Sequence, residues 1–383
     1  MIRTDKPIKI GVMTKPLDNW KSGSGHHLDE LMKHVLDLCE STYTGQFEFT
    51  FVHYNKSDNP IYTRVKELIV PRNPFAASKI LKKHNFDIIH YSPLSIFAPV
   101  WGIKAKKTAT VHGIEERLFP KGYSFIQRFH DCNIQPIYMR AMDGIATVSE
   151  TGRQWFISHY RIKADSIVVT TNGLSDVYKI LPENKKNLTD FPLINRAFVM
   201  HISNCSARKN PETVIKGFAS FIKNTGKDYL LVCAGKGWDN QNIRNLASAE
   251  GIEDLFITPG FISEDAAVRL LNKAEAFVFP SWAEGFGMPN VEAMACGCPV
   301  ITSNIFAIPE VVGDAAIIIS KPDAVEEVAL ALEHITGNAE TKKALVKRGL
   351  KQCKKYNWND SAEIILGLWK RILLTDRIKD KKE

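Results

Sequence analysis

Short apolar runs alternate with amphipathic stretches along the whole chain. The apolar runs predict strands at 9–12, 47–53, 86–90, 108–111, 144–148, 166–170, 198–202, 229–234, 255–258, 276–279, 300–302 and 316–319. Between them, helical spacing of apolar residues is found at 27–39, 76–84 and 152–160. Strands that alternate with helices are typical of parallel sheets, so the pattern predicts an α/β protein.

The length of 383 residues indicates two domains of about 190 residues each. The polar stretch 181–190 follows the turn at 171–173 and is the predicted linker. We therefore expect an amino-terminal domain over 1–180, a second domain over 191–360 and a carboxyl-terminal helix over 361–383. The apolar spacing at 358 and 364–374 is typical of a helix that packs on a domain, and a plain carboxyl-terminal packing helix is compatible with it.

The positive charge is concentrated in the first half of the chain. Residues 1–190 carry 26 Lys and Arg against 19 Asp and Glu, whereas 191–383 carry 24 against 23. A solvated face is the first interpretation, and an anionic membrane surface or acidic acceptor is the second. The aromatic-rich run 123–140 is either core or an amphipathic face that contacts lipid or an apolar acceptor. No nucleic-acid-binding motif is present, so we expect no nucleic-acid partner.

Two features of the composition concern the cellular compartment. No run reaches the roughly 18 apolar residues of a spanning helix, and the first residues lack the apolar segment of a signal peptide. Seven cysteines without a C-x-x-C pair favour reduced thiols over disulfides or a zinc site. We expect a cytoplasmic protein, with peripheral contact to the inner face of the membrane as an additional hypothesis.

The stretch 279–300 carries the strongest functional signal. It sets Glu284 and Glu292 eight positions apart around Gly285 and Gly287, with Pro289 suited to the first turn of a helix. Both carboxylates are therefore predicted at the carboxyl end of a strand, where open α/β sheets bind ligands. Ionised carboxylates accept hydrogen bonds from sugar hydroxyls, so this segment predicts a nucleotide-sugar site. The alternative is that Glu284 is a solvated loop residue and Glu292 only caps a helix.

A second candidate site follows the first strand of the second half. Arg208 and Lys209 precede a helix that Asn210 is predicted to cap and Pro211 to begin, and two cations at a helix start favour an anion. The alternative is an exposed cation pair. Near the amino terminus, 22–25 is glycine-rich, but Leu28 stands where a dinucleotide fingerprint needs its third glycine, which argues against a dehydrogenase.

The stretch 279–300, continued without a gap by 304–316, resembles the signature of the group 1 (family 4) glycosyltransferases. This family comprises retaining, nucleotide-sugar-dependent enzymes. The resemblance implies the GT-B fold, in which two Rossmann-like domains face each other across a cleft and the last helix returns to the first domain. Many members carry an arginine five positions before the lysine, where this chain has Asn204. The Arg208-Lys209-Asn210 variant resembles mannosyl- and related transferases of cell-surface polysaccharide assembly.

The resemblance also implies the roles of individual residues. Arg208 and Lys209 would hold the diphosphate, Glu292 the ribose, Glu284 the transferred sugar, and His112 would line the reacting face. The implied catalytic residues are therefore Glu284, His112, Arg208 and Lys209. The implied donor-binding residues are Gly25, Gly285, Phe286, Gly287, Met288, Glu292, Gly235, Phe261 and Ile262.

The expected function is retaining transfer of a hexose from a nucleotide-diphosphate sugar. UDP- and GDP-linked donors are both compatible with the sequence, and the expected acceptor is a hydroxyl group on a glycan or lipid-linked glycan. Apart from the donor we expect no cofactor and no metal, because no acidic motif typical of metal-bound diphosphates is present. Two alternatives remain open: a nucleotide-sugar epimerase on the same fold, and a non-catalytic nucleotide-sugar-binding subunit.

Overall fold

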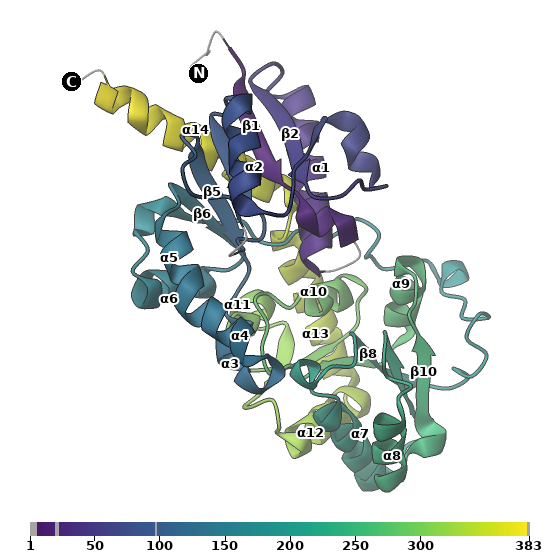
Figure 1. Cartoon of the computed structure of the whole chain (residues 1–383). Helices are drawn as coiled ribbons and strands as arrows, with labels where there is room; N and C mark the ends of the chain where they lie inside the picture. Colours follow the sequence, from purple (N-terminus) through teal and green to yellow (C-terminus); the bar gives the residue numbers. More distant parts are fainter. Residues whose placement is uncertain (1–5, 20–22, 96–97, 381–383) are drawn as a thin grey trace. The chain divides into compact units, whose positions relative to one another are not determined.

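The computed structural model describes residues 6–19, 23–95 and 98–380. The chain forms two compact units (Figure 1). Unit 1 comprises residues 1–117, 123–173 and 357–383, and unit 2 comprises 118–122 and 174–356. Each unit is built on its own parallel sheet.

Unit 1 contains a seven-stranded parallel sheet in the order β3-β2-β1-β4-β5-β6-β7. Its strands are β1 (Ile8–Met13), β2 (Phe47–His53), β3 (Lys66–Ile69), β4 (Ile88–Tyr91), β5 (Lys106–Val111), β6 (Gly144–Thr147) and β7 (Ile167–Val169). Its helices are α1 (Gly23–Ser41), α2 (Pro74–Leu81), α3 (Glu115–Leu118), α4 (Phe125–Phe129), α5 (Gln135–Arg140), α6 (Glu150–Tyr160) and α14 (Trp358–Asp380), with a π-helical turn His130–Ile134 between α4 and α5.

Unit 2 contains a six-stranded parallel sheet in the order β10-β9-β8-β11-β12-β13. Its strands are β8 (Phe198–Ile202), β9 (Leu230–Ala234), β10 (Phe256–Gly260), β11 (Ala276–Phe279), β12 (Val300–Ser303) and β13 (Ala316–Ile319). Its helices are α7 (Pro211–Thr225), α8 (Gln241–Ala249), α9 (Glu264–Lys273), α10 (Met288–Ala295), α11 (Ile308–Val312), α12 (Val325–Gly337) and α13 (Ala339–Gln352). The predicted α/β class is confirmed.

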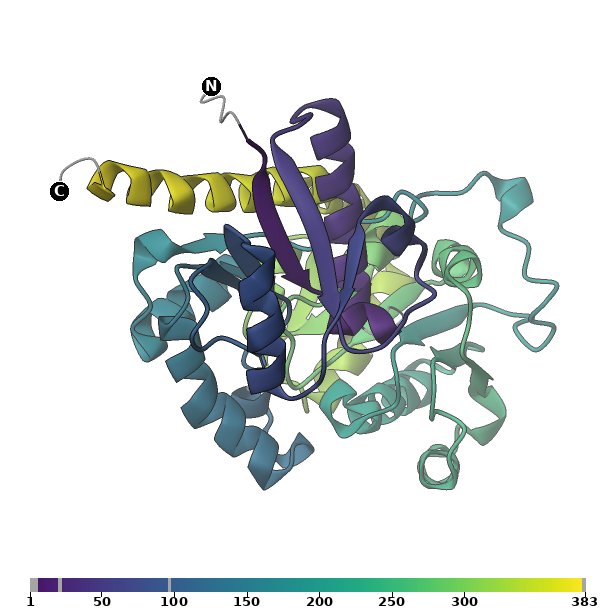
Figure 2. The same cartoon turned by 45° about the horizontal axis from the view of Figure 1, so that its top comes forward.

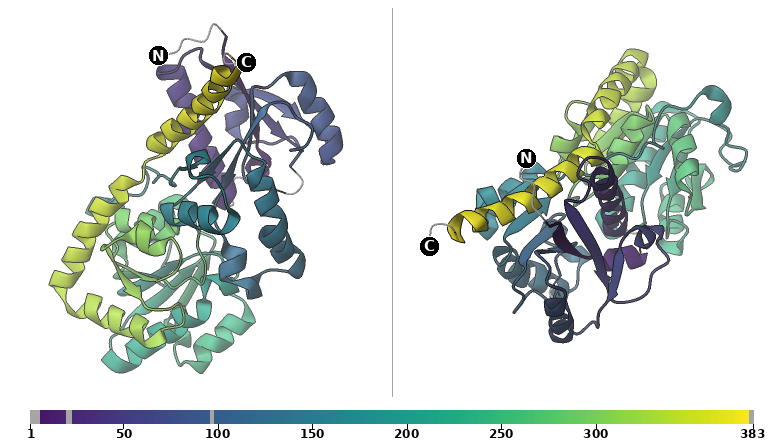
Figure 3. Two further views of the ribbon diagram at one scale, coloured as in Figure 1. Left: turned by 90° about the vertical axis from the view of Figure 1, so that its left-hand side faces the viewer. Right: turned by 90° about the horizontal axis from the view of Figure 1, so that it is seen from above.

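The carboxyl-terminal helix belongs to unit 1. Helix α14 packs against α1 and also contacts β5, β6 and β7. In Figures 2 and 3 the yellow helix lies beside the purple elements of the amino-terminal sheet. Trp369 is fully buried in the same core as Leu28 and Phe51, and its Nε1 donates to Thr108 Oγ1 at 3.1 Å. The return of this helix to the first domain is thus observed, and the helix begins at Trp358.

The stretch 181–190, predicted as the linker, runs along α9 within unit 2. The Leu181 N–H donates to Asn272 Oδ1 at 2.8 Å, and Asp190 pairs with Arg269 at 2.6 Å. Glu183 pairs with Lys273 in the same way. Apart from the short excursion of residues 118–122 into unit 2, the chain instead passes between the units at 173–174 and 356–357. The polar composition of residues 181–190 suggested a free linker, but polar groups of this segment bind to side chains of α9.

Candidate active site

The candidate site lies at the carboxyl ends of β8 and β11. These strands are neighbours, and the chain leaves them in opposite directions, toward β9 and β10 on one side and toward β12 and β13 on the other. Loops that follow two such strands diverge and leave a crevice, which is where open α/β sheets bind ligands. Residues 203–209 follow β8 and residues 280–287 follow β11, so both predicted motifs meet at this point of unit 2.

Three of the four predicted catalytic residues form one ion cluster. Glu284 is only 7% exposed, and its Oε1 accepts hydrogen bonds from Arg208 Nη1 at 2.9 Å and Lys209 Nζ at 2.6 Å. Arg208 Nη1 also donates to the carbonyl oxygen of Ala283 at 2.6 Å, and the Trp282 N–H donates to the Arg208 carbonyl oxygen at 2.9 Å. The two loops are therefore tied together by side-chain and main-chain bonds. Glu284 is not a solvated loop residue.

The charges in this cluster keep Glu284 ionised. Burial alone would raise the pKa of Glu284, but the neighbouring charges of Lys209 and then Arg208 outweigh burial and hold the pKa below its ordinary value. The Lys209 ammonium also lies 4.6 Å from the centre of the Phe279 ring. The site thus combines one buried carboxylate, an acceptor for hydroxyl groups, with two cations suited to phosphate oxygens.

Asn210 fixes the position of the cation pair. It adopts a left-handed conformation (φ 58°) and its Oδ1 accepts the Thr213 N–H, so its predicted role as the cap of α7 is confirmed. Its Nδ2 donates to the carbonyl oxygens of Pro280 at 3.0 Å and Pro322 at 2.7 Å. One buried amide therefore connects the loops that follow β8, β11 and β13.

Glu292 differs from its predicted environment. Helix α10 begins at Met288, which puts Glu292 in the second turn, where the helix dipole has little effect. Burial, and then the charge of Glu264, raise the pKa of Glu292 to about 7, although Lys209 acts in the opposite direction. The helix start therefore does not offset the effect of burial on Glu292, and the ionised form is not favoured.

The glycine-rich turn presents its backbone at the site. Gly287 has φ +88° and immediately precedes α10, a conformation that favours glycine. Phe286 is 4% exposed and packs edge-on against Tyr356, with ring centres 5.1 Å apart. Phe286 can therefore contact a ligand only through its backbone. The same holds for Gly285, which has no side chain. Met288, at the start of the helix, is half-buried.

The loops that carry Gly235, Phe261 and Ile262, all implied donor-binding residues, adjoin the β8 loop. The Gly235 N–H donates to the Gly260 carbonyl oxygen at 2.7 Å, and the Ser203 N–H donates to the Ala234 carbonyl oxygen at 3.0 Å. Gly235 has φ +128°, and a Cβ there would lie 2.1 Å from the Ser203 carbonyl oxygen. Next to Gly260, Phe261 exposes 76% of its surface. Ile262 is half-buried.

Gly25 and His112, the other two predicted residues, belong to unit 1. Gly25 is buried inside α1, so it is not in a loop, and the expected glycine-rich loop is corrected because α1 already begins at Gly23. Ser22 lies outside the described residues. His112 directly follows β5 as predicted, and burial lowers its pKa to about 4, so the ring is neutral at physiological pH.

His201 supports the site and was not predicted. Its ring is fully buried at the end of β8, where Nδ1 donates to the Val278 carbonyl oxygen at 2.8 Å and Nε2 lies 2.7 Å from Ser203 Oγ. Burial lowers its pKa to about 4. This neutral histidine connects β11 to the first residue of the β8 loop. A polar residue at the end of an otherwise apolar strand was the sequence signal for it.

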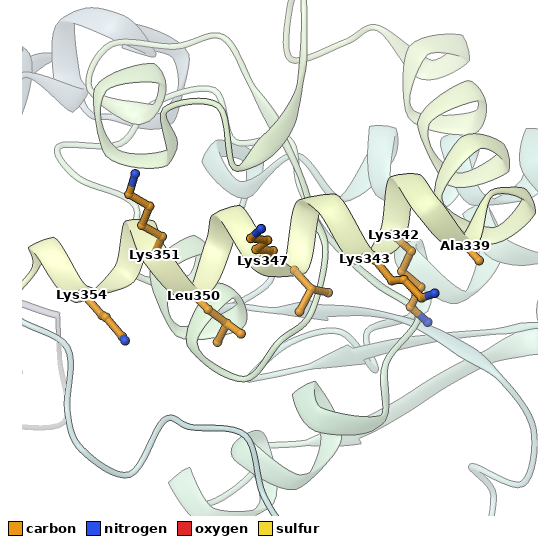
Figure 4. Close-up of a pocket in the computed structure, with 8 residues that line it drawn as sticks. Ala339, Lys342, Lys343, Lys347, Leu350, Lys351 and Lys354 are labelled. Carbon is orange, nitrogen blue, oxygen red and sulfur yellow. The ribbon is translucent and has the colours of Figure 1, made fainter.

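A separate hollow of about 660 Å³ lies along α13. It is lined by Ala339, Lys342, Lys343, Val346, Lys347, Leu350, Lys351 and Lys354, and Figure 4 shows these lysine side chains extending from the helix. It shares no residue with the ion cluster. Across 6–19, 23–95 and 98–380, no group of three or more His, Cys, Asp or Glu is placed to hold a metal ion. The same residues include no helix long and apolar enough to cross a membrane.

The fold of this chain is shared with solved structures. The chain is similar to sucrose-phosphate synthase from Thermosynechococcus elongatus, with a TM-score of 0.76 and 15% identity over 96% of this chain and 100% of that one. It is also similar to Anabaena HepE in complex with UDP and glucose, with a TM-score of 0.73 and 17% identity over 94% and 99% of the two chains. Two Rossmann-like parallel-sheet units with these neighbours define a protein of the GT-B fold.

Family models account for both units. The model described as "Glycosyl transferases group 1" matches residues 185–352, and the model described as "Glycosyltransferase Family 4" matches residues 25–176. The chain is therefore a group 1 glycosyltransferase.

Curated relatives agree with this assignment. The chain is 28% identical to O-antigen chain mannosyltransferase B of Escherichia coli, over 95% of this chain and 100% of that protein. It is 25% identical to the serotype-specific mannosyltransferase WbdA of Escherichia coli, over 76% of this chain and 36% of that protein. The resemblance to mannosyltransferases first indicated by residues 208–210 is confirmed.

Proposed function

We propose that this protein transfers a hexose from a nucleotide-diphosphate sugar to a hydroxyl group of a glycan or lipid-linked glycan during cell-surface polysaccharide synthesis. The observation that carries the proposal is the buried cluster of Glu284 with Arg208 and Lys209 at the strand switch of unit 2. The name of the O-antigen chain mannosyltransferase that it resembles supports the polysaccharide context. A UDP- or GDP-linked donor suits this site.

The proposed roles follow the chemistry of each group. Arg208 and Lys209 neutralise the donor diphosphate. Glu284 accepts hydrogen bonds from the sugar hydroxyls, and the backbone N–H groups of residues 285–288 donate hydrogen bonds to the sugar. Glu292 binds the ribose diol, and the loops at Gly235 and residues 261–262 border the base. In unit 1, Gly25 borders the donor and His112 lines the reacting face of the sugar.

The proposed reaction retains the configuration of the sugar and needs no metal ion. The bond between C1 and the phosphate oxygen breaks as the acceptor oxygen attacks from the same face, and the acceptor proton passes to the departing phosphate. Stabilising the charge of the leaving diphosphate is the largest electrostatic demand of such a transfer. In the proposed mechanism two half-buried cations, Arg208 and Lys209, meet that demand without a divalent ion.

A transfer assay tests this proposal. Purified protein is incubated with GDP-mannose or UDP-glucose and a mannoside acceptor, and proton NMR reads the configuration of the new glycosidic bond. We expect an α-linked product, unchanged turnover with EDTA, and a loss of at least about 100-fold in Glu284→Ala. Inverted product or loss of turnover with EDTA would overturn the mechanism. A new sugar nucleotide formed without acceptor would indicate the epimerase, and binding without turnover a non-catalytic subunit.

We further propose a cytoplasmic location with peripheral contact to anionic lipid through α4 and α5. Phe125, Ile126 and Phe129 are exposed on this run, the first by 79%, and so is Ile137. The exposed charges on the run are those of Arg128 and Arg140, since Asp131 is half-buried. Apolar side chains flanked by cations suit a membrane interface. Co-sedimentation with phosphatidylglycerol vesicles at low salt should be lost in Phe125→Ser/Ile126→Ser/Phe129→Ser, and wild-type protein that stays in solution would refute the contact.

A further inference from the structure

Three buried polar atoms gather at the carboxyl edge of the unit 1 sheet. The atoms are His27 Nε2, His112 Nε2 and Trp358 Nε1, and none has a hydrogen-bond partner among the residues described. The ring centres of His27 and His112 are 4.6 Å apart at 89°, and those of His27 and Trp358 are 5.4 Å apart. Buried polar atoms without partners are uncommon in folded proteins, and a group of three concentrates unmet hydrogen-bonding capacity that a polar ligand would satisfy.

Asn172 fixes the hydrogen positions on His27. The His27 ring is 3% exposed, and its Nδ1 lies 2.7 Å from Asn172 Oδ1. Because an amide oxygen only accepts hydrogen bonds, Nδ1 must carry the hydrogen. Burial, and then the proximity of His112, lower the pKa of His27, so the ring is neutral. Nε2 is therefore a bare acceptor.

The start of α14 holds Asn172 in place. A Cβ on Gly173 would lie 2.4 Å from the backbone nitrogen of Trp358, so the chain can pass here only as glycine. Ser361 Oγ donates to the Thr171 carbonyl oxygen at 2.6 Å. Residues on both sides of Asn172 are thus anchored to the carboxyl-terminal helix, and through Asn172 the helix fixes the His27 ring.

We propose that His27, held in one tautomer by Asn172, is a substrate-binding residue that accepts a hydrogen bond at Nε2 from a sugar hydroxyl beside His112. The ligand class is a polyol, because the site offers a bare acceptor, a second imidazole and an indole N–H in one buried group, and a sugar hydroxyl both donates and accepts. This inference rests on the proposed function for the identity of the substrate.

Two substitutions distinguish the roles of the two ring nitrogens of His27. His27→Gln keeps a polar acceptor near the Nε2 position, whereas His27→Asn keeps only the donor toward Asn172. We expect kcat/KM to fall about tenfold further in His27→Asn than in His27→Gln, the usual effect of losing one buried hydrogen bond. The exposed His84→Asn is the matched control and should match wild type. Equal activity of the two His27 variants, both folded by thermal unfolding, would overturn the proposal.

A second measurement, by NMR, uses the wild-type protein. In ¹⁵N spectra of histidine-labelled wild type, His27 should show a protonated Nδ1 and a bare Nε2, and the Nε2 signal should move on addition of GDP-mannose with methyl α-mannoside. A protonated Nε2, or a signal that does not move under conditions of turnover, would overturn the inference. If wild type transfers no hexose at all, the proposed function fails instead, and the tautomer result still tests the role of Asn172.

Discussion

Two glutamates eight positions apart have pKa values that are shifted in opposite directions. Glu284 stays ionised because Lys209 and Arg208 contact it directly, and their charges outweigh the cost of burial. Glu292 has no ion-pair partner among the described residues, and burial, with Glu264 nearby, raises its pKa to about 7. The contrast gives each carboxylate a different chemistry: a fixed negative charge at Glu284 and a group near its titration point at Glu292.

Glu292 should make stability depend on pH. Its pKa rises from an ordinary value of 4.5 to about 7 in the folded chain, so between these values the folded state binds more protons than the unfolded state. The free energy of unfolding should therefore fall as the pH rises from 4.5 through 7. Glu292→Gln lacks this dependence and should unfold at a higher temperature than wild type at pH 8. At pH 4, where the carboxyl is protonated in both states, the two should coincide.

Thermal unfolding at the two pH values provides the check. Glu253→Gln, at an exposed position of unit 2, is the control and should follow wild type at both. A Glu292→Gln variant with the same melting temperature as wild type at pH 8 would show that Glu292 ionises without penalty.

The sequence placed Glu284, Arg208 and Lys209 in one predicted site, but it did not predict how these side chains contact each other. Spacing and residue type were sufficient for Glu284, Arg208 and Lys209, because a strand end and a helix start fix where such side chains emerge. The ion pairs between them join positions about 75 residues apart. His27 and Asn172 are 145 positions apart, and no local pattern connects them.

At the scale of elements, the loops after β8, β9 and β10 are bonded in series through Ser203 and Gly235. Gly235→Ala should lower the stability of unit 2 by roughly 3 kcal/mol, because a Cβ would meet the Ser203 carbonyl oxygen at 2.1 Å in a left-handed backbone. The matched control is Gly226→Ala, which has φ +62° and no neighbour within 4 Å and should lose only about 1 kcal/mol. Urea unfolding measures both, and equal losses would show that the close approach is not rigid.

Element boundaries followed the hydrophobic pattern closely, and the exceptions have physical causes. Strands β2, β8, β11 and β13 have the predicted bounds because each is a compact apolar run. Strand β3 (Lys66–Ile69) was not predicted, since it is an exposed edge with charged residues at its start. Helix α1 begins earlier than predicted because Gly23 and Gly25 join its first turns despite their low helix propensity.

At the scale of the whole molecule, each unit has its own hydrophobic core. One is centred on residues such as Phe51 and Trp369, and the other on residues such as Phe218 and Trp238. The two-domain organisation follows from length and pattern alone. The points where the chain changes unit do not, because they depend on whether polar segments attach to a helix, as residues 181–190 do.

The central claim is that unit 2 binds a nucleotide diphosphate through Arg208 and Lys209. Thermal unfolding with UDP, GDP, ADP or CMP tests it most directly, since a ligand at about 100 times its dissociation constant adds about 2.7 kcal/mol to stability. The account predicts a rise in melting temperature with UDP or GDP that is absent in Arg208→Ala/Lys209→Ala. No rise with any nucleotide, or a rise that survives the double substitution, would contradict it.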